Sequence, residues 1–213
     1  MSEYVQWHRD ALGEKLVNAL TKNNFTATYI PTREEAAAKM LELIPSNATI
    51  GFGGSVTLAQ LDIITKLEQR GNPVLNYMKP GLSQQEIRAI RRQHLLSDVF
   101  LSGTNAVTLD GKLVNVDATG NRVGPMLFGP DKVFIVVGIN KIVHDIAEAE
   151  NRIKLWASPP NNKRLDYPNP CAQTGVCVDC QGPSRICNIT TIIHKKPRQT
   201  DIHVIVVGED LGL

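Results

Sequence analysis

The feature that most limits the fold is an alternation of short apolar runs with segments of helical spacing. Runs of strand type occupy Thr26–Ile30, Ala48–Phe52 and Lys132–Gly138. Between such runs, apolar residues recur every three or four positions, and at the start of the chain these are Leu12, Leu16, Val17 and Leu20. Strands that alternate with helices form a mostly parallel sheet with helices on both faces. We therefore predict a three-layer α/β fold.

Two capping-box sequences mark the starts of helices. Thr32-Arg-Glu-Glu35 and Ser83-Gln-Gln-Glu86 each place a hydroxyl three positions before a glutamate, as a helix N-terminus prefers. The other predicted elements are a helix through Leu58, Leu61 and Ile64, a helix through Ile142, Ile146, Ala149 and Ile153, strands at Pro73–Tyr77, Val99–Ser102 and Ile202–Val207, and a Pro/Asn-rich break at Ser158–Asn162.

A β-hairpin interrupts this pattern. The β-type runs Ala106–Leu109 and Lys112–Val116 flank Asp110-Gly111. Asp-Gly between two such runs predicts a two-residue turn, because both central positions of that turn need positive φ. The hairpin is thus an insertion in a βα pattern.

Length and charge limit the class of protein. The chain has 213 residues and a net charge of +2, which suits one domain over 1–213 and gives no reason to expect nucleic acid as a partner. Its longest apolar run, Val133–Val137, is too short to span a membrane, and the N-terminus lacks an apolar core of signal-peptide length. We expect a cytoplasmic protein whose four cysteines are reduced thiols or metal ligands.

Two stretches have the composition of a binding site. The first runs from Gly51 through Gly53 and Gly54 to Ser55, between a predicted strand and a predicted helix. Glycines let the backbone approach a ligand closely, and backbone amides at a helix start favour anions. The stretch is neither a dinucleotide fingerprint nor a P-loop, and a tight turn capped by Ser55 or Thr57 would explain it equally well.

The second stretch, Ser102–Gly124, is dense in small, amide and acidic residues where strands should end. Ligands of open α/β sheets collect at such carboxyl ends. Asn and Asp also serve turns, and Asp110 is interpreted as a turn residue. Arg122 offers a planar fork suited to a carboxylate or phosphate. The candidate ligand-binding residues here are Thr104, Asn105, Asn115, Asp117, Gly120, Asn121 and Arg122, with Lys79 and Lys141 as further charges beside strand ends.

The segment SDVFLSGTNAVTLDGKLVNVDATGNRVGPMLFGPDKVFIVVGINKIV closely resembles the LUD family of lactate utilisation proteins. The resemblance begins near Gly51, continues through RIKLWASPPN and the cysteine segment, and reaches the terminal VIVVGEDLGL. It implies a fold of the NagB/RpiA/CoA-transferase type and a role in oxidising L-lactate to pyruvate beside iron–sulfur partner proteins. The resemblance assigns no catalytic residue.

A four-cysteine segment at 171–187 is appended to this domain. Cys171, Cys177, Cys180 and Cys187 lie among Gly and Pro residues, in a pattern suited to a tetrahedral zinc ion or an iron–sulfur cluster. The outer spacings match neither a standard zinc ribbon nor a bacterial ferredoxin. Within a metal assignment, the redox setting of the resembled family favours an iron–sulfur cluster over zinc. A redox dithiol at the Cys177–Cys180 pair is a third interpretation.

Three functions follow from these patterns. The first is an accessory or subunit of a lactate-oxidising system that binds a small anionic ligand. The second is a stand-alone enzyme acting on a phosphorylated sugar or an acyl-CoA. The third is a metal-binding interaction module. A homo-oligomer is left open in each case.

Overall fold

Two sheets organise the chain, which is described here by a computed structural model covering residues 2–213. The main sheet has five parallel strands in the order β1-β9-β6-β3-β2. Its strands are β1 (Thr26–Ile30), β2 (Ile50–Phe52), β3 (Val99–Gly103), β6 (Lys132–Gly138) and β9 (Asp201–Val207). The smaller sheet, in the order β7-β4-β5-β8, contains β4 (Ala106–Thr108), β5 (Leu113–Asp117), β7 (Ile142–Val143) and β8 (Ile189–Ile193). This confirms the predicted α/β fold with a mostly parallel sheet.

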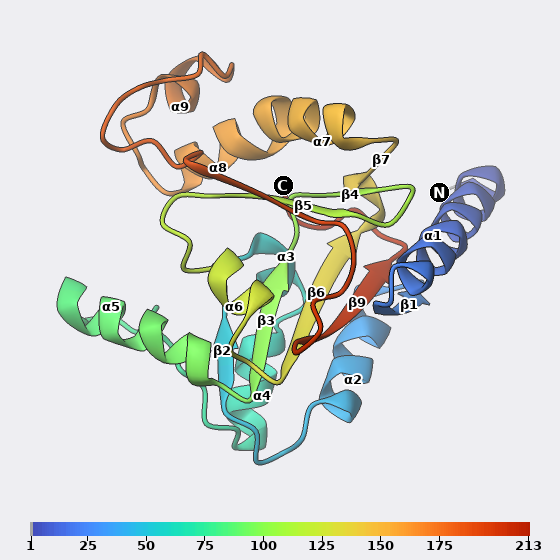
Figure 1. The fold of residues 1–213 in the computed structure, drawn as a ribbon, viewed down its shortest axis with the longest axis horizontal. Helices are drawn as coiled ribbons and strands as arrows, with labels where there is room; N and C mark the ends of the chain where they lie inside the picture. Colours follow the sequence, from blue (N-terminus) through green and yellow to red (C-terminus); the bar gives the residue numbers. More distant parts are fainter. Residues whose placement is uncertain (1) are drawn as a thin grey trace.

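Helices cover both faces of the main sheet. The helices within residues 2–213 are α1 (Glu3–Lys22), α2 (Arg33–Leu43), α3 (Val56–Gln60), α4 (Ile63–Arg70), α5 (Gln84–Gln93), α6 (Val123–Leu127), α7 (Ile146–Arg152), α8 (Ser158–Arg164) and α9 (Pro170–Thr174). No helix within residues 2–213 is long and apolar enough to cross a membrane. In Figure 1, α2 and α4 lie by the main sheet, whereas α7, α8 and α9 lie beyond the smaller sheet.

The side chains of β6 show how one strand serves two cores. Val133, Ile135 and Val137 pack with Leu16 and Leu20 of α1, whereas Phe134 and Val136 pack against helices α2 to α4 on the other face. These five of the seven β6 residues are fully buried. A strand buried on both faces is apolar at every position, which is why the unbroken run in the sequence predicted it correctly.

The smaller sheet lies over the carboxyl ends of β3 and β6 (Figure 1). β3 leads into β4 after only two residues, and the η2 turn (Ile139–Lys141) joins β6 to β7 in the same way. β5 runs antiparallel to both β4 and β8. The loops that leave the main sheet are therefore enclosed between the two sheets.

The hairpin turn differs from the prediction. Three residues, Leu109, Asp110 and Gly111, connect the paired strand ends, and the Gly111 amide donates to the Thr108 carbonyl at 2.8 Å. Gly111 has φ of +83°, but Asp110 does not have positive φ. This is a tight turn followed by a left-handed glycine, the usual three-residue hairpin connection.

The predicted strand at Pro73–Tyr77 is wrong. Only Val74 bridges to Ile50 of β2. The Asn76 side chain then accepts a hydrogen bond from the Met78 amide at 2.9 Å, and this local bond turns the chain away from the sheet edge.

The predicted break at Ser158–Asn162 is also wrong, since those residues lie in α8. Pro159 and Pro160 occupy its first turn, where no backbone donor is needed. A π-helical turn, η3 (Ile153–Ala157), joins α7 to α8 without an interruption. The predicted helix through Ile142 begins later, at Ile146, because Ile142 belongs to β7. The helix predicted through Leu58, Leu61 and Ile64 is split into α3 and α4 at Asp62, whose φ is +52°.

Candidate functional site

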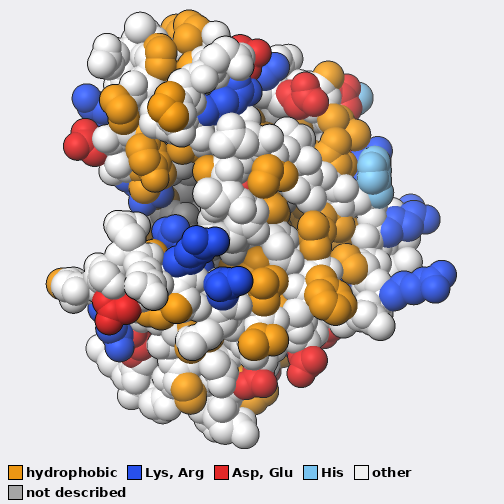
Figure 2. Space-filling model, turned by 60° about the vertical axis from the view of Figure 1, so that its left-hand side comes forward, with side chains coloured by type: hydrophobic (Ala, Val, Ile, Leu, Met, Phe, Trp, Pro, Cys, Tyr) orange, Lys and Arg blue, Asp and Glu red, His pale blue; other side chains and the backbone are white. Residues whose placement is uncertain are grey.

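A cleft lies where the main sheet, the smaller sheet and α8 meet. It consists of two adjoining cavities of about 100 and 210 Å³. Both are lined by Gly54, Asn105, Val116, Arg122, Ala157, Asn161 and Arg164. Figure 2 shows this face of the molecule hollowed, with Lys and Arg side chains at the rim of the hollow. The cleft therefore has the position that ligands take in open α/β sheets, beyond the carboxyl ends of the strands.

The two predicted loops meet at this cleft. Gly54 and Ser55 follow β2, and Arg122 follows β5, yet all three line the smaller, inner cavity. A side chain at Gly53 would place its Cβ 2.9 Å from Arg122 Cγ, so a glycine there leaves room for the arginine. The two stretches that have the composition of a binding site therefore line one pocket.

The candidate residues divide into those that line the cleft and those behind it. The lining residues are Gly54, Ser55, Thr104, Asn105, Asp117, Asn121, Arg122 and Lys141. Gly51, Gly53, Asn115, Gly120 and Lys79 do not line it. Whether the lining residues bind a ligand stays a prediction.

Asp117 organises its own loop. Its Oδ1 accepts hydrogen bonds from the amides of Thr119 and Gly120, each at 3.2 Å. Its Oδ2 accepts from the amides of Arg122 and Val123, at 3.2 and 3.1 Å. Four backbone donors thus converge on one buried carboxylate. The geometry assigns Asp117 a structural role, because little of its hydrogen-bonding capacity is left for a ligand.

Arg122 is held just as completely. Nη1 donates to Asn115 Oδ1 at 2.7 Å and to the Gly103 carbonyl at 3.2 Å. Nη2 donates to Asn105 Oδ1 at 2.9 Å and to the Val116 carbonyl at 2.8 Å. The predicted fork for an anion is therefore occupied by protein acceptors. Arg122 contributes a fixed positive charge beside the cavity rather than free donors.

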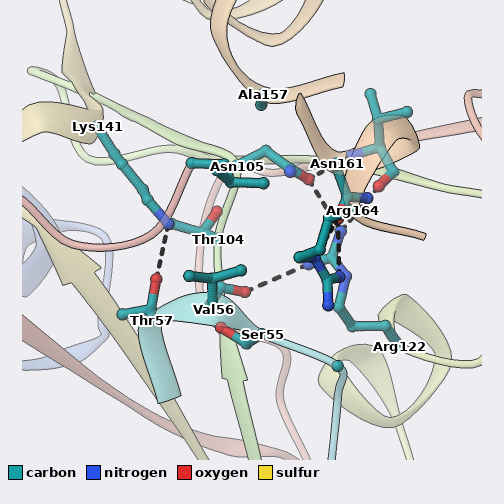
Figure 3. Close-up of a pocket in the computed structure, with 14 residues that line it drawn as sticks. Ser55, Val56, Thr57, Thr104, Asn105, Arg122, Lys141, Ala157, Asn161 and Arg164 are labelled. Atoms are coloured by element: carbon teal, nitrogen blue, oxygen red, sulfur yellow. Dashed lines mark hydrogen bonds between the residues drawn. The ribbon is translucent and has the colours of Figure 1, made fainter. Parts of the chain in front are cut away.

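Lys141 is the buried cation of the inner cavity. Its side chain is 4% exposed overall, and Nζ donates to Thr57 Oγ1 at 2.9 Å. Figure 3 shows the amine reaching Thr57 with Thr104 and Asn105 beside it. Burial, followed by the positive charges of Arg152 and Arg122, lowers the pKa of Lys141 to about 7. Its protonation state consequently changes near neutral pH.

The larger, outer cavity has aromatic and cationic walls that the sequence analysis missed. Arg91 stacks on Tyr77, with its guanidinium carbon 4.6 Å from the ring centroid. Burial raises the pKa of Tyr77, and the nearby charges of Arg91 and Arg164 oppose that rise. Arg164 and Asn161 come from α8, the helix that was interpreted as a break. A proline-rich sequence gave no signal that these residues would face a ligand.

The charge balance of the cleft is strongly positive. Arg91, Arg122, Lys141 and Arg164 line it. Among the described residues that line it, Asp117 has the single acidic side chain, and four backbone amides already donate hydrogen bonds to it. Asn105 and Asn161 add amide groups whose Nδ2 atoms have no hydrogen-bond acceptor within residues 2–213. Such a cleft favours an anion.

The cysteine segment reaches the cleft at one point. Cys187 lines the outer cavity, and its thiol donates to Ser158 Oγ of α8 at 3.3 Å. Asn169 makes a second connection, because its Nδ2 donates to Asn162 Oδ1 at 2.6 Å and to the Ser184 carbonyl at 2.8 Å. The cysteine segment and α8 are therefore packed as one unit.

All four cysteines are free thiols, and Cys171 is buried. Burial raises the pKa of Cys171, and the neighbouring Cys180, Cys177 and Cys187 raise it further. Arg185 orders the segment by donating to the carbonyls of Cys180 and Cys187 at 2.6 and 3.0 Å. Over residues 2–213, no three His, Cys, Asp or Glu side chains are arranged to hold a metal ion. The predicted metal at these cysteines stays a prediction.

Comparisons with known proteins agree with the fold. A family model described as the LUD domain matches residues 13–207. A solved structure of a DUF162 family protein from Deinococcus radiodurans is 15% identical, with a TM-score of 0.53, and covers 93% of this chain and 98% of its own. Ribose 5-phosphate isomerase from Plasmodium falciparum gives a TM-score of 0.34 at 19% identity, over 53% of this chain and 52% of its own. No curated protein matches the sequence.

Proposed function

The chain belongs to the LUD domain family, and from this premise we propose that it binds a small anionic ligand, with L-lactate or pyruvate as the first candidates, in the cleft beneath α8. Membership of this family connects the chain with lactate utilisation in general. The observation that carries the proposal is the balance of charged side chains in the cleft, where four basic side chains line the same space as one acidic side chain that already accepts backbone hydrogen bonds.

The division of roles among the cations supports this proposal. Arg122 supplies charge without free donors, because its Nη hydrogens are used within the protein. Arg164 keeps Nη1 without an acceptor in residues 2–213, and it lies over both cavities. We infer that Arg164 makes the direct contact with the anion and that Arg122 strengthens the field around it.

The size of the cleft favours a small acid over an acyl-CoA. Its cavities of about 100 and 210 Å³ are at or below the lower limit of about 300 Å³ for drug-sized ligands. A three-carbon hydroxy or oxo acid fits such a space, whereas a whole coenzyme A molecule would extend far outside it. A phosphorylated sugar shares the negative charge and is the second candidate.

Oxidation of lactate would require an acceptor. Conversion of a hydroxy acid to an oxo acid breaks a C–H and an O–H bond and releases two electrons and two protons. We place this chain as an accessory or subunit that works in the cytoplasm with iron–sulfur partners, which would accept the electrons. A metal or cluster at Cys171, Cys177, Cys180 and Cys187 would add a thiolate-held redox or structural centre. It would also offset the repulsion among the thiolates, which together with the larger effect of burial raises the pKa of Cys171.

A binding experiment tests the ligand assignment. Isothermal titration with L-lactate, pyruvate and uncharged lactamide should show heat of binding for the acids alone. Arg164→Ala should weaken acid binding roughly tenfold or more, since a charge-assisted hydrogen bond is worth about 1.5–3 kcal/mol. Lys163→Ala is the matched control, because this substitution removes an equal charge from the same helix and Lys163 does not line the cleft. Equal losses for both variants, or equal binding of lactamide, would contradict the proposal.

The role in oxidation needs a separate assay. Purified protein, combined with candidate iron–sulfur partner proteins, should transfer electrons from L-lactate to an artificial acceptor. If no such combination transfers electrons while the protein still binds the acids, the role in oxidation is wrong and the protein is a binding protein for the acids. If ribose 5-phosphate binds and both three-carbon acids do not, the second candidate replaces the first.

A further inference from the structure

Lys141 has surroundings that a simple anion-binding lysine does not need. It lies in the η2 turn directly after β6, it is almost fully buried, and no carboxylate lies within ion-pair distance among residues 2–213. Burial of an unpaired ammonium group is costly. An exposed lysine at the rim would attract an anion without that cost. The burial of Lys141 therefore points to a function that uses its neutral amine.

The contacts around Lys141 orient such an amine. Nζ donates one hydrogen to Thr57 Oγ1 at 2.9 Å. The backbone of Gly212 closes one side, since a Cβ at that residue would lie 2.7 Å from Nζ. Nζ has no other hydrogen-bond partner within residues 2–213, and the residue lines the inner cavity beside Thr104 and Asn105 (Figure 3). With one N–H directed to Thr57, the lone pair of the neutral amine is available to the cavity.

The charges nearby keep part of this amine neutral. Arg122 is bonded in place on one side, and Arg152 is fixed on another by bonds to the Asn140 and Asn105 carbonyls at 3.1 and 2.7 Å. Both arginines disfavour a third positive charge, and burial disfavours it more strongly. A lysine that is desolvated and placed beside other cations is activated as a nucleophile.

We propose that Lys141 is a nucleophile that forms an imine with a small aldehyde or ketone carrying an anionic group. This inference rests on the proposed function, because it takes the same cleft as the anion site. The Nζ lone pair attacks the carbonyl carbon, and the C=O π electrons move to oxygen, giving a carbinolamine. The two hydrogens of the amine leave with that oxygen as water, and a C=N bond remains. No oxidant or reductant is required.

The rest of the cleft fits the other end of such a ligand. The carboxylate or phosphate would lie toward Arg164, which borders both cavities. Thr57 Oγ1 lies where a hydroxyl can relay a proton to the departing oxygen, because it is already bonded to the attacking nitrogen. An oxo acid and a keto phosphate share this chemistry, and the experiment below separates them.

Borohydride trapping tests the proposal on the whole protein. The protein is incubated with pyruvate or with dihydroxyacetone phosphate, reduced with sodium cyanoborohydride, and analysed by intact mass and peptide mapping. The expected result with pyruvate is a single adduct of the mass of pyruvic acid less one oxygen atom, located on Lys141. Acetone, which lacks the anion, should give at least tenfold less adduct, and L-lactate, which lacks the carbonyl, should give none.

Variants locate the reaction. Lys141→Arg keeps the charge and removes the nucleophile, so it should abolish the adduct. Lys154→Arg alters an exposed lysine outside the cleft and should leave the adduct unchanged. If Lys141→Arg fails to fold, peptide mapping of the trapped protein without substitutions still shows which lysine carries the adduct. The yield should rise steeply between about pH 6 and pH 8, following the free amine.

The outcomes separate the two proposals. If pyruvate or dihydroxyacetone phosphate raises the melting temperature but leaves Lys141 unmodified, the imine proposal is wrong and the proposed anion site stands. Adducts spread over several exposed lysines would also overturn it. An adduct with only one of the two anionic carbonyl compounds supports the imine and identifies which class of ligand the cleft takes.

Discussion

Asp117 and Arg122 are joined twice, once through the backbone and once through their side chains. Asp117 Oδ2 accepts the Arg122 amide hydrogen at 3.2 Å and lies 3.9 Å from Arg122 Nε. Since Arg122 also binds Asn105 and Asn115, this pair connects the loop after β5 to both strands of the hairpin. The floor of the cleft is therefore set by hydrogen bonds among its own residues before any ligand arrives.

The first prediction concerns Asp117→Asn. An amide nitrogen cannot accept a hydrogen bond, so two of the four backbone donors would lose their acceptor. We expect the free energy of unfolding to fall by about 2–6 kcal/mol, at about 1–3 kcal/mol for each of the two unsatisfied buried donors. Urea unfolding followed by circular dichroism measures this. Asp166→Asn, at an exposed turn position with φ of +54° that Asn tolerates, should change stability by less than about 0.5 kcal/mol. Similar effects of the two variants would contradict the structural role of Asp117.

The second prediction concerns the hairpin glycine. A Cβ at Gly111, where φ is +83°, would lie 2.8 Å from the backbone of Ala19 in α1. Gly111→Ala should therefore cost about 1 kcal/mol of left-handed strain and a further 1–3 kcal/mol of overpacking. Gly175→Ala is the matched control, because Gly175 has φ of +73° with open space around it. Thermal or urea unfolding should show the larger loss for Gly111→Ala, and equal losses would place α1 away from the hairpin.

The third prediction is a pH dependence of stability. The folded-state pKa of Lys141 is lowered from 10.5 to about 7, so between these values the unfolded chain binds more protons than the folded one. The free energy of unfolding contributed by Lys141 thus rises with pH across that window, and the burial penalty is complete below about pH 7. Lys141→Met should stabilise the protein most near pH 6, by at most about 5 kcal/mol, and the gain should shrink toward pH 10.

Urea unfolding of both proteins at several pH values measures that difference. Lys154→Met is its control, since Lys154 is exposed, and its stability difference from the unmodified protein should not vary with pH. A Lys141→Met gain that stays constant or grows as pH rises would mean that Lys141 remains charged when folded.

The sequence predicted most of the main sheet because four of its five strands, β2, β3, β6 and β9, are buried along nearly their whole length, whereas the edge strand β1 is partly exposed. The run 133–137 has no polar position, so no other arrangement hides it from water. Predictions failed where local bonds override the pattern. Asn76 turns the chain out of the sheet, and the two prolines of α8 are accommodated because they fall in a first helical turn.

The site was predicted in part for a similar reason. Lys141 was found because charged residues after strands of a parallel sheet gather at one edge. Arg122 was found from its residue type and loop position, although it follows β5 of the smaller sheet, which is antiparallel to both of its neighbours. Arg164 and Asn161 were not found, because their direction depends on the π-helical turn η3 and on how α8 packs against the cysteine segment. Neither feature leaves a mark in local periodicity. The structural role of Asp117 could not be predicted either, because its residue type suggests a ligand contact, whereas its hydrogen bonds to four backbone amides stabilise its own loop.

The fourth prediction concerns metal at the cysteines. Protein purified without oxygen should contain zinc or iron in elemental analysis, and iron–sulfur would add broad visible absorption. Cys177→Ser or Cys180→Ser should release the metal and leave the parallel sheet intact, as judged by circular dichroism. A protein that contains no metal and keeps 171–187 protected from hydrogen exchange would contradict the metal and show that the hydrogen bonds of Arg185, Asn169 and Cys187 are enough to order that segment.

The last prediction joins the cysteine segment to the cleft through Asn169. Its side chain makes three hydrogen bonds, to Asn162, to the Ser184 carbonyl and from the Ser184 hydroxyl, and it is 2% exposed. Asn169→Ala would leave buried polar groups on α8 and on the segment without partners, at about 1–3 kcal/mol each. Because α8 carries Arg164, we expect faster hydrogen exchange in both 158–164 and 171–187 and a several-fold weaker Kd for pyruvate.

Gln173→Ala, on the exposed side of α9, is the control and should change neither quantity. Loosening of 171–187 alone, with the exchange of α8 and the Kd unchanged, would show that the segment is a separate appendage. Loss in both places would mean that whatever occupies the cysteines, whether metal, disulfide or proton, acts on the anion site through α8. The hydrogen bond between Cys187 and Ser158 is a second connection for that coupling, because Cys187 is the one cysteine of the described residues that lines the cleft.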